Sequence, residues 1–111
     1  MESKPQEVRE YITVEGRNPF REWLHELKDI QARARIRVRL NRLRLGNLGD
    51  SKSLGGGVYE LRVPFGPGYR VYFGKAGTMV VILLCGGQKG TQNKDIVKAK
   101  EFWEDYKRRS L

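Results

Sequence analysis

Cysteine and histidine are nearly missing from this sequence: Cys85 and His25 are the single representatives of each in 111 residues. One cysteine excludes a disulfide scaffold within the chain, and one cysteine with one histidine excludes a Cys/His zinc cluster. A Ser-His-Asp or Cys-His catalytic triad would have to use His25. On a helical wheel His25 points away from the neighbouring apolar residues, which predicts a solvated surface histidine rather than a general base.

Long apolar runs and an N-terminal targeting signal are also lacking. The longest apolar run, Met79–Cys85, is far shorter than the ~18 residues of a membrane span and fits a buried strand. Residues 1–5 contain no apolar segment typical of a signal peptide. Together with the single cysteine, these features predict a cytoplasmic protein that does not associate with a membrane.

Positive charge, in contrast, is abundant. The chain has 22 lysines and arginines against 13 aspartates and glutamates, a formal net charge of +9. A polyanionic partner, either nucleic acid or an acidic protein, would explain this excess; the alternative is a basic but otherwise ordinary protein. With 39% hydrophobic and 10% aromatic residues, the chain should form a single folded domain over residues 1–111.

The hydrophobic pattern predicts four strands and three helices. Strands are expected over residues 8–14, 58–63, 69–74 and 78–85, and helices over 19–27, 31–45 and from about 93 onward. Asn18 is the expected N-cap of the first helix and Pro19 its first residue. Residues 51–57 and 86–92 are expected to be irregular. The order β-α-α-β-β-β-α predicts an α+β domain, an antiparallel sheet with helices packed on one face.

The hairpin around residues 64–68 brings two arginines together. Its short turn places Arg62 opposite Arg70 and Glu60 opposite Tyr72. These four side chains are expected on an open sheet face, because the apolar residues between them must face the helices. Two adjacent guanidinium groups repel each other, but together they can bind one phosphate. The alternative is a solvated face with a diagonal Glu60–Arg70 ion pair worth about 0–1 kcal/mol.

A glycine-rich segment, Gly86–Thr91, precedes the last helix and carries Lys89. Loop amides and a helix N-terminus together form a natural phosphate cradle. The spacing is not that of a Walker loop. The alternative is a loop that only caps the helix.

Several segments, in their order and spacing, are similar to one family. The segments are Phe20–Leu24, Ala32–Ile36, Leu45–Asn47, Val58–Arg62, Gly66–Phe73, Leu83–Gln92, Asp95–Ile96 and Ala99–Lys100. They resemble the phage-derived addiction module killer proteins, a branch of the RelE/HigB/ParE toxin superfamily, from Tyr11 to about Trp103. The resemblance implies a small RelE-like domain and the toxin of a bacterial type II toxin–antitoxin pair.

RelE-like and HigB-like members cut mRNA in the ribosomal A site, so the resemblance implies a ribosome-dependent endoribonuclease. In this mechanism a ribose 2′-hydroxyl attacks the adjacent phosphate, while the protein stabilises the pentavalent charge and assists the proton transfers. Neither a metal nor a small-molecule cofactor is implied. The implied partners are mRNA, the ribosome A site and a cognate antitoxin with a helix-turn-helix DNA-binding domain.

The resemblance also implies roles for individual residues. Arg70 matches the family's arginine that contacts the scissile phosphate. Arg62 falls at a basic strand position, and Lys89 falls in a loop that carries further basic catalytic residues. The family's C-terminal catalytic tyrosine or histidine has no obvious counterpart near Lys94, so the general base is open between Glu60 and Lys89.

Four further residues are expected to contact the RNA. They are Tyr72, which would stack on a base, and Lys52, Gln92 and Lys94. Two alternative functions remain open from the sequence. One is a ParE-like toxin that poisons gyrase and has no nuclease site. The other is a degenerate, non-toxic RNA-binding module.

Overall fold

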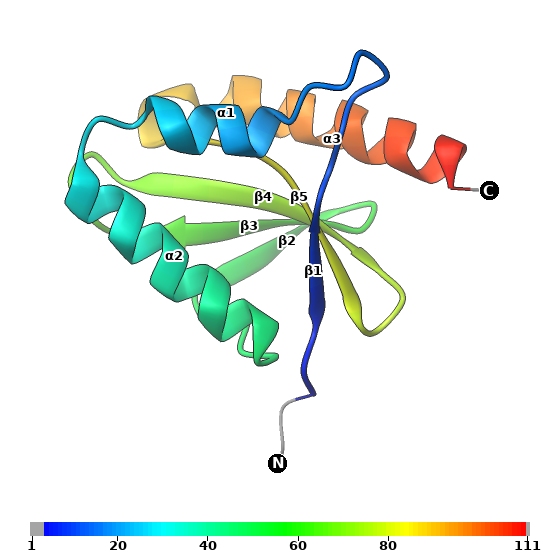
Figure 1. Cartoon of the computed structure of the whole chain (residues 1–111), viewed down its shortest axis with the longest axis horizontal. Helices are drawn as coiled ribbons and strands as arrows, with labels where there is room; N and C mark the ends of the chain where they lie inside the picture. Colours follow the sequence, from blue (N-terminus) through cyan, green and yellow to red (C-terminus); the bar gives the residue numbers. More distant parts are fainter. Residues whose placement is uncertain (1–3, 111) are drawn as a thin grey trace.

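The computed structural model describes residues 4–110 and contains a five-stranded sheet with three α-helices (Figure 1). In chain order the elements are β1 (Glu7–Glu10), α1 (Pro19–Glu26), α2 (Ile30–Arg44), β2 (Ser51–Gly55), β3 (Val58–Val63), β4 (Tyr69–Ala76), β5 (Val80–Gln88), a 3-10 turn (Lys89–Thr91) and α3 (Gln92–Arg109). The predicted α+β class is confirmed. No helix within residues 4–110 is long and apolar enough to cross a membrane.

The sheet is mixed, with the strand order β1-β5-β4-β3-β2. Strands β2 to β5 pair antiparallel, as expected, whereas β1 pairs parallel with β5. The parallel pairing of β1 departs from the expected all-antiparallel sheet. It is possible because β1 and β5 are far apart in the chain, whereas a short hairpin would make them antiparallel. Strand β1 also ends at Glu10 rather than at residue 14, since the chain turns between Thr13 and Arg17 to enter α1.

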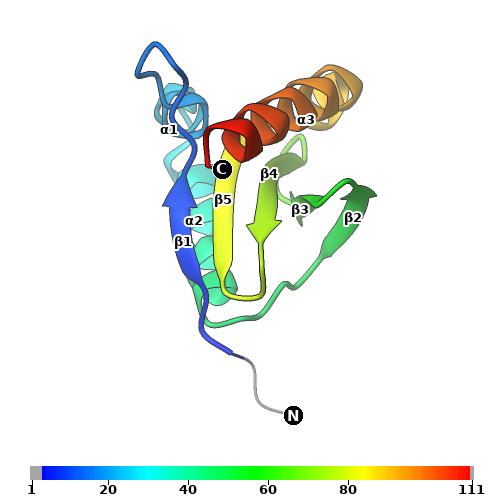
Figure 2. The same cartoon turned by 90° about the vertical axis from the view of Figure 1, so that its right-hand side faces the viewer.

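Helices cover both faces of the sheet rather than one (Figure 2). The first face packs against α1 and α2 through a core cluster of Phe20, Leu24, Ala32, Ile36, Leu40, Leu43, Leu61, Val63, Tyr69, Val71, Phe73, Val81 and Leu83. The second face packs against α3 through Tyr11, Val58, Tyr72, Ile82, Leu84, Cys85, Ala99 and Trp103. Strand β5 is apolar on both faces, and such a continuous apolar run is typical of a strand covered on both sides.

Side-chain caps fix where α1 and α2 begin. The Asn18 Oδ1 accepts a hydrogen bond from the Arg21 amide at 3.0 Å, and Pro19 is the first helical residue. The prediction of this cap is confirmed. Asp29 caps α2 in the same way and accepts a hydrogen bond from the Gln31 amide at 2.9 Å. Only residues 27–29 lie between the end of α1 and the start of α2.

Two segments that were expected to be irregular contain strand. Ser51–Gly55 forms β2 and pairs with β3 at the edge of the sheet. Gly86–Gln88 continues β5 and pairs with the start of β4. Serine, lysine and glycine have low strand propensity, so these segments are strands because a neighbouring strand supplies hydrogen-bond partners, which local composition does not predict.

Two glycines of the sheet allow α3 to lie close to it. A Cβ atom on Gly74 would come within 2.2 Å of the Trp103 ring, and one on Gly87 would come within 1.8 Å of the Asp95 carboxylate. Glycine in a strand often marks such a close approach. The glycines therefore set the distance between α3 and the sheet, and with it the geometry of the polar cluster described next.

Candidate functional site

Strands β3 and β4 pair Arg62 with Arg70 and Glu60 with Tyr72, so the predicted register is confirmed. The face that carries these side chains is not open, however. Because α3 covers part of it, Tyr72 is 0% exposed and Glu60 is 1% exposed. Tyr72 packs in the same cluster as Trp103. The prediction that Tyr72 stacks on a base from an open face is therefore wrong.

A polar cluster of Glu60, Arg70 and Gln92 lies where α3 begins. The Arg70 Nε atom is 3.5 Å from Glu60 Oε1, and the Gln92 side-chain amide donates a hydrogen bond to Glu60 Oε2 at 2.8 Å. The predicted diagonal ion pair therefore exists, but it is buried rather than solvated. The Arg70 side chain is 12% exposed. Its Nε and Nη1 atoms are buried and have no hydrogen-bond partner among residues 4–110, so the exposed part of Arg70 does not include these two donors.

Arg62 lies directly opposite Arg70, in the same row of cross-strand neighbours, and is more exposed. Its side chain is 44% exposed, and its Nε atom is 3.6 Å from Asp50 Oδ1. Each arginine thus has a carboxylate of its own, which offsets the repulsion between the paired guanidinium groups. The next residue in this row is Gly87, which pairs with Arg70 and has no side chain. The Asp95 carboxylate of α3 occupies the space beside Gly87, so the two arginines are the last basic side chains at this end of the pairing.

The Tyr72 hydroxyl is a second unused polar group of the cluster. It is buried and has no hydrogen-bond partner within residues 4–110. Burial, and next the negative charge of Glu60, raise the pKa of Tyr72 above its ordinary value, so the phenol is neutral at physiological pH.

The three predicted lysines surround the cluster and are exposed. Lys52 lies on β2 opposite Glu60. The Lys89 amide donates a hydrogen bond to the Gly68 carbonyl at 2.9 Å, which places Lys89 beside the β3–β4 turn. Lys94 belongs to the first turn of α3. The ion pairs formed within residues 4–110 include none of the three, so their charge is available to a ligand.

The glycine-rich segment is strand in its first half and a 3-10 turn in its second half. Gly86 and Gly87 are part of strand β5 and pair with β4. The Thr91 hydroxyl donates to the Asp95 carboxylate at 2.5 Å and lies 3.3 Å from the carbonyl of Gln88. The segment thus ends β5 and organises the start of α3, as the alternative interpretation expects. The segment contributes Lys89 to the site, and Gln92 follows it as the first residue of α3.

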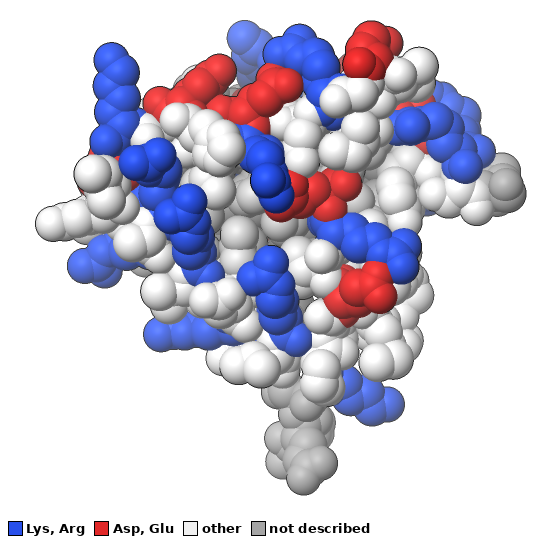
Figure 3. Space-filling model, viewed as in Figure 1, with Lys and Arg blue, Asp and Glu red and all other residues white. Residues whose placement is uncertain are grey.

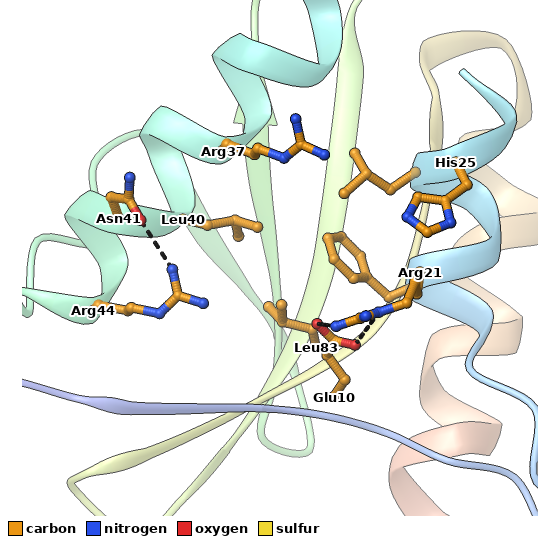
Figure 4. A pocket seen from close by; sticks show the side chains of 10 residues that line it. Glu10, Arg21, His25, Arg37, Leu40, Asn41, Arg44 and Leu83 are labelled. Carbon is orange, nitrogen blue, oxygen red and sulfur yellow. Dashed lines mark hydrogen bonds and ion pairs between the residues drawn. The ribbon is translucent and has the colours of Figure 1, made fainter. Parts of the chain in front are cut away.

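A separate cleft of about 310 Å³ lies between α1 and α2, against the other side of the sheet (Figure 4). His25 lines it, together with Arg37 and with an Arg21–Glu10 ion pair of 3.0 Å. His25 is exposed, as predicted, and does not belong to the Arg70 cluster. Within residues 4–110, no three histidine, cysteine, aspartate or glutamate side chains gather closely enough to hold a metal ion.

Positive charge extends along α2, where arginine side chains follow one another over the surface (Figure 3). The helix carries six arginines and no acidic residue: Arg33, Arg35, Arg37, Arg39, Arg42 and Arg44. None of them takes part in an ion pair within residues 4–110. Such a field attracts polyanions at long range, although α2 packs on the face opposite the Arg70 cluster.

Comparison with known proteins gives two findings. The family model described as "Phage derived protein Gp49-like" matches residues 22–104. An uncharacterized protein of Haemophilus influenzae is 52% identical over 89 residues, which are 80% of this chain and 90% of the relative. The matched family range includes every predicted site residue, from Lys52 to Lys94.

Proposed function

This chain belongs to the Gp49-like family of phage-derived proteins, a family of the toxin–antitoxin type, and on that premise we propose that it is a toxin that cleaves mRNA on the ribosome. The observation that carries the proposal is Arg70, a largely buried guanidinium held by the Glu60 carboxylate and paired across the sheet with a second arginine, Arg62. A phosphodiester is a ligand for which two planar guanidinium groups are well suited.

The proposed reaction is attack of a ribose 2′-oxygen on the adjacent phosphorus. The new bond to the 2′-oxygen forms as the bond to the 5′-oxygen breaks, which yields a 2′,3′-cyclic phosphate and a 5′-hydroxyl. Negative charge builds up on the non-bridging oxygens during this step. Arg70 would contact these oxygens and Arg62 would support it, and stabilisation of developing charge is commonly the largest contribution to catalysis.

Two proton transfers accompany this step: the 2′-hydroxyl loses a proton, which water takes up, and the leaving 5′-oxygen gains one. Lys89, whose ammonium group donates but does not accept, is the favoured candidate for the second transfer. Lys89 is exposed and lies beside the β3–β4 turn, whereas Glu60 is 1% exposed and already accepts a hydrogen bond from Gln92. A group that exchanges a proton with the RNA must lie within reach of it. The geometry therefore favours Lys89 over Glu60 as the group that touches the substrate.

The lysines around the cluster support RNA binding along this edge of the molecule. Lys52 and Lys94 flank Arg70 and are exposed, so they would contact the phosphate backbone on either side of the cut. Each such contact makes binding more sensitive to salt. A cognate antitoxin with a helix-turn-helix domain would neutralise the toxin, and the excess charge of +9 suits an acidic partner segment.

The test is inducible expression in a bacterium of the wild type, Arg70→Ala and Arg9→Ala, with growth curves and mapping of new mRNA 5′ ends. Arg9 is an exposed arginine of β1, at the sheet edge far from β3, and serves as the matched control. We expect wild type and Arg9→Ala to arrest growth and to cut mRNA within translated codons, and Arg70→Ala to do neither.

Two results would contradict the proposal. Growth arrest with intact mRNA, unchanged by Arg70→Ala, would point to a gyrase poison. Absence of any arrest from a well-expressed wild type would point to a non-toxic RNA-binding module.

A further inference from the structure

Glu60 is the one buried charged residue in the part of the chain that the structure describes. It lies in the middle of β3, with α3 covering that face. Removing a carboxylate from water is costly unless hydrogen bonds and an opposite charge compensate. Two neighbours, Arg70 and Gln92, provide this compensation for Glu60.

Each oxygen of Glu60 faces a different element. Oε1 lies 3.5 Å from Arg70 Nε on β4, and Oε2 accepts the side-chain amide of Gln92 at 2.8 Å. Gln92 is the first residue of α3. Its amide is neutral at every pH, so it occupies one oxygen without competing with Arg70 for the charge. The contact from Gln92 thus leaves the second oxygen oriented toward the guanidinium.

We propose that Gln92 and Glu60 are positioning residues that hold the guanidinium of Arg70 in the orientation in which it meets the scissile phosphate. This inference rests on the proposed function and extends it by two residues. Glu60 anchors the buried side of Arg70, and Gln92 fixes the carboxylate of Glu60. The RNA contacts only the exposed part of Arg70. Gln92, which was expected to bind RNA, and Glu60, which was a candidate base, therefore act through Arg70.

The competing explanation is that the Gln92–Glu60 hydrogen bond only fastens α3 to the sheet. In that case its loss would lower stability and leave Arg70 as it is. A positioning role predicts a loss of turnover without a comparable loss of substrate binding, because a displaced guanidinium still attracts RNA. A shift of about 1 Å at a reacting centre can cost about 100-fold in rate.

The variant that separates these explanations is Gln92→Met. Methionine matches glutamine in length and fills the same space, but it cannot donate to Glu60. Gln31→Met is the matched control, because Gln31 is an exposed glutamine in the first turn of α2, against the opposite face of the sheet. Thermal unfolding of both variants checks that the fold is retained.

Two readouts are needed. The first is kcat and KM for cleavage of a defined mRNA on ribosomes by the purified chain. We expect Gln92→Met to lower kcat by about 10- to 100-fold with KM within about 2-fold, and Gln31→Met to match the wild type. Wild-type kcat in Gln92→Met would overturn the inference, as would an equal change in kcat and KM.

The second readout does not depend on cleavage. In ¹⁵N-labelled protein the Arg70 Nε–H signal, assigned by its loss in Arg70→Ala, reports how rigidly this guanidinium is held. We expect a signal distinct from those of the surface arginines in the wild type and in Gln31→Met, and a shift toward them in Gln92→Met. An unchanged signal in Gln92→Met would overturn the inference. If the wild type cuts no RNA but the Arg70 Nε–H signal still shifts in Gln92→Met, the proposed function alone is contradicted.

Discussion

Arg62 and Arg70 are the same amino acid in the same row of the sheet, yet their surroundings differ. Arg70 is 12% exposed and faces a buried carboxylate, whereas Arg62 is 44% exposed and faces the exposed Asp50. Electrostatic interactions are stronger where water is excluded. We therefore expect the proposed cleavage to depend on the orientation of the Arg70 guanidinium as well as on its charge.

Replacement by lysine tests this difference, because lysine keeps the charge but loses the planar fork of donors. We expect Arg70→Lys to lose most of the cleavage activity, by about 100-fold or more in kcat, and Arg62→Lys to retain activity within about 10-fold. Single-turnover cleavage of a defined mRNA on ribosomes measures both. Equal losses in the two variants would contradict the different roles that burial gives them.

At the residue scale the sequence predicts the pairing of the site but not its burial. Alternation along β3 and β4 is sufficient to place Arg62 opposite Arg70, since side-chain direction in a strand follows from position alone. The exposure of Tyr72 and Glu60 depends on where α3 packs, which is a tertiary feature. The family resemblance includes Gln92, but only the structure shows that Gln92 forms a hydrogen bond with Glu60.

At the scale of elements, the packing of α3 on the sheet is the feature on which the site depends. Gly74 lies beneath Trp103, and the Trp103 indole nitrogen donates a hydrogen bond to the Gly56 carbonyl at 2.9 Å. A side chain at position 74 would displace the helix that covers Glu60. Cores that are already filled accept added atoms only at a cost of about 1–3 kcal/mol.

We therefore expect Gly74→Ala to lower the free energy of unfolding by about 1–3 kcal/mol. Gly90→Ala is the control, because a Cβ atom at Gly90 would meet nothing within 4 Å and Gly90 has no positive φ angle. Urea unfolding followed by tryptophan fluorescence measures both variants. Equal stability of Gly74→Ala and the wild type would show that α3 is not held at the distance described.

The sequence predicts the helices better than the sheet. Side-chain caps at Asn18 and Asp29 act within a few residues, so the starts of α1 and α2 follow from local chemistry. The parallel pairing of β1 and the strand character of Ser51–Gly55 arise from contacts between distant segments. The two-sided burial of the sheet has the same origin, and no local pattern specifies it.

At the scale of the whole molecule, a polar contact joins the N-terminal part of the chain to the end of α3. The Tyr11 hydroxyl donates a hydrogen bond to Asp105 Oδ2 at 2.6 Å, and Arg109 also bonds this oxygen, at 3.0 Å. Tyr11 is buried against Phe102, with the ring centroids 5.0 Å apart. The hydrogen bond from Tyr11, and next those from the arginines, hold the pKa of Asp105 below its ordinary value of 3.8.

A carboxyl group whose pKa is lower in the folded than in the unfolded state stabilises the fold at pH values above its unfolded pKa. This stabilisation is lost as the pH falls through the pKa of the folded state. We therefore expect Tyr11→Phe to unfold at lower urea concentration than the wild type at pH 7, and the difference to shrink below about pH 4. Tyr59→Phe is the control, since the Tyr59 ring stacks on Phe73 on the other face of the sheet. A pH-independent difference for Tyr11→Phe would contradict the role of Asp105.

Ribosome-dependent cleavage that needs Arg70 is the proposed activity of this protein. The most direct measurement is incubation of the purified chain with ribosomes that hold a defined codon of a labelled mRNA in the A site, followed by analysis of the new RNA ends. We expect a cut within that codon with a 2′,3′-cyclic phosphate end, slowed about 10²–10³-fold in Arg70→Ala. Intact mRNA, or cleavage at the same rate in Arg70→Ala, would contradict it.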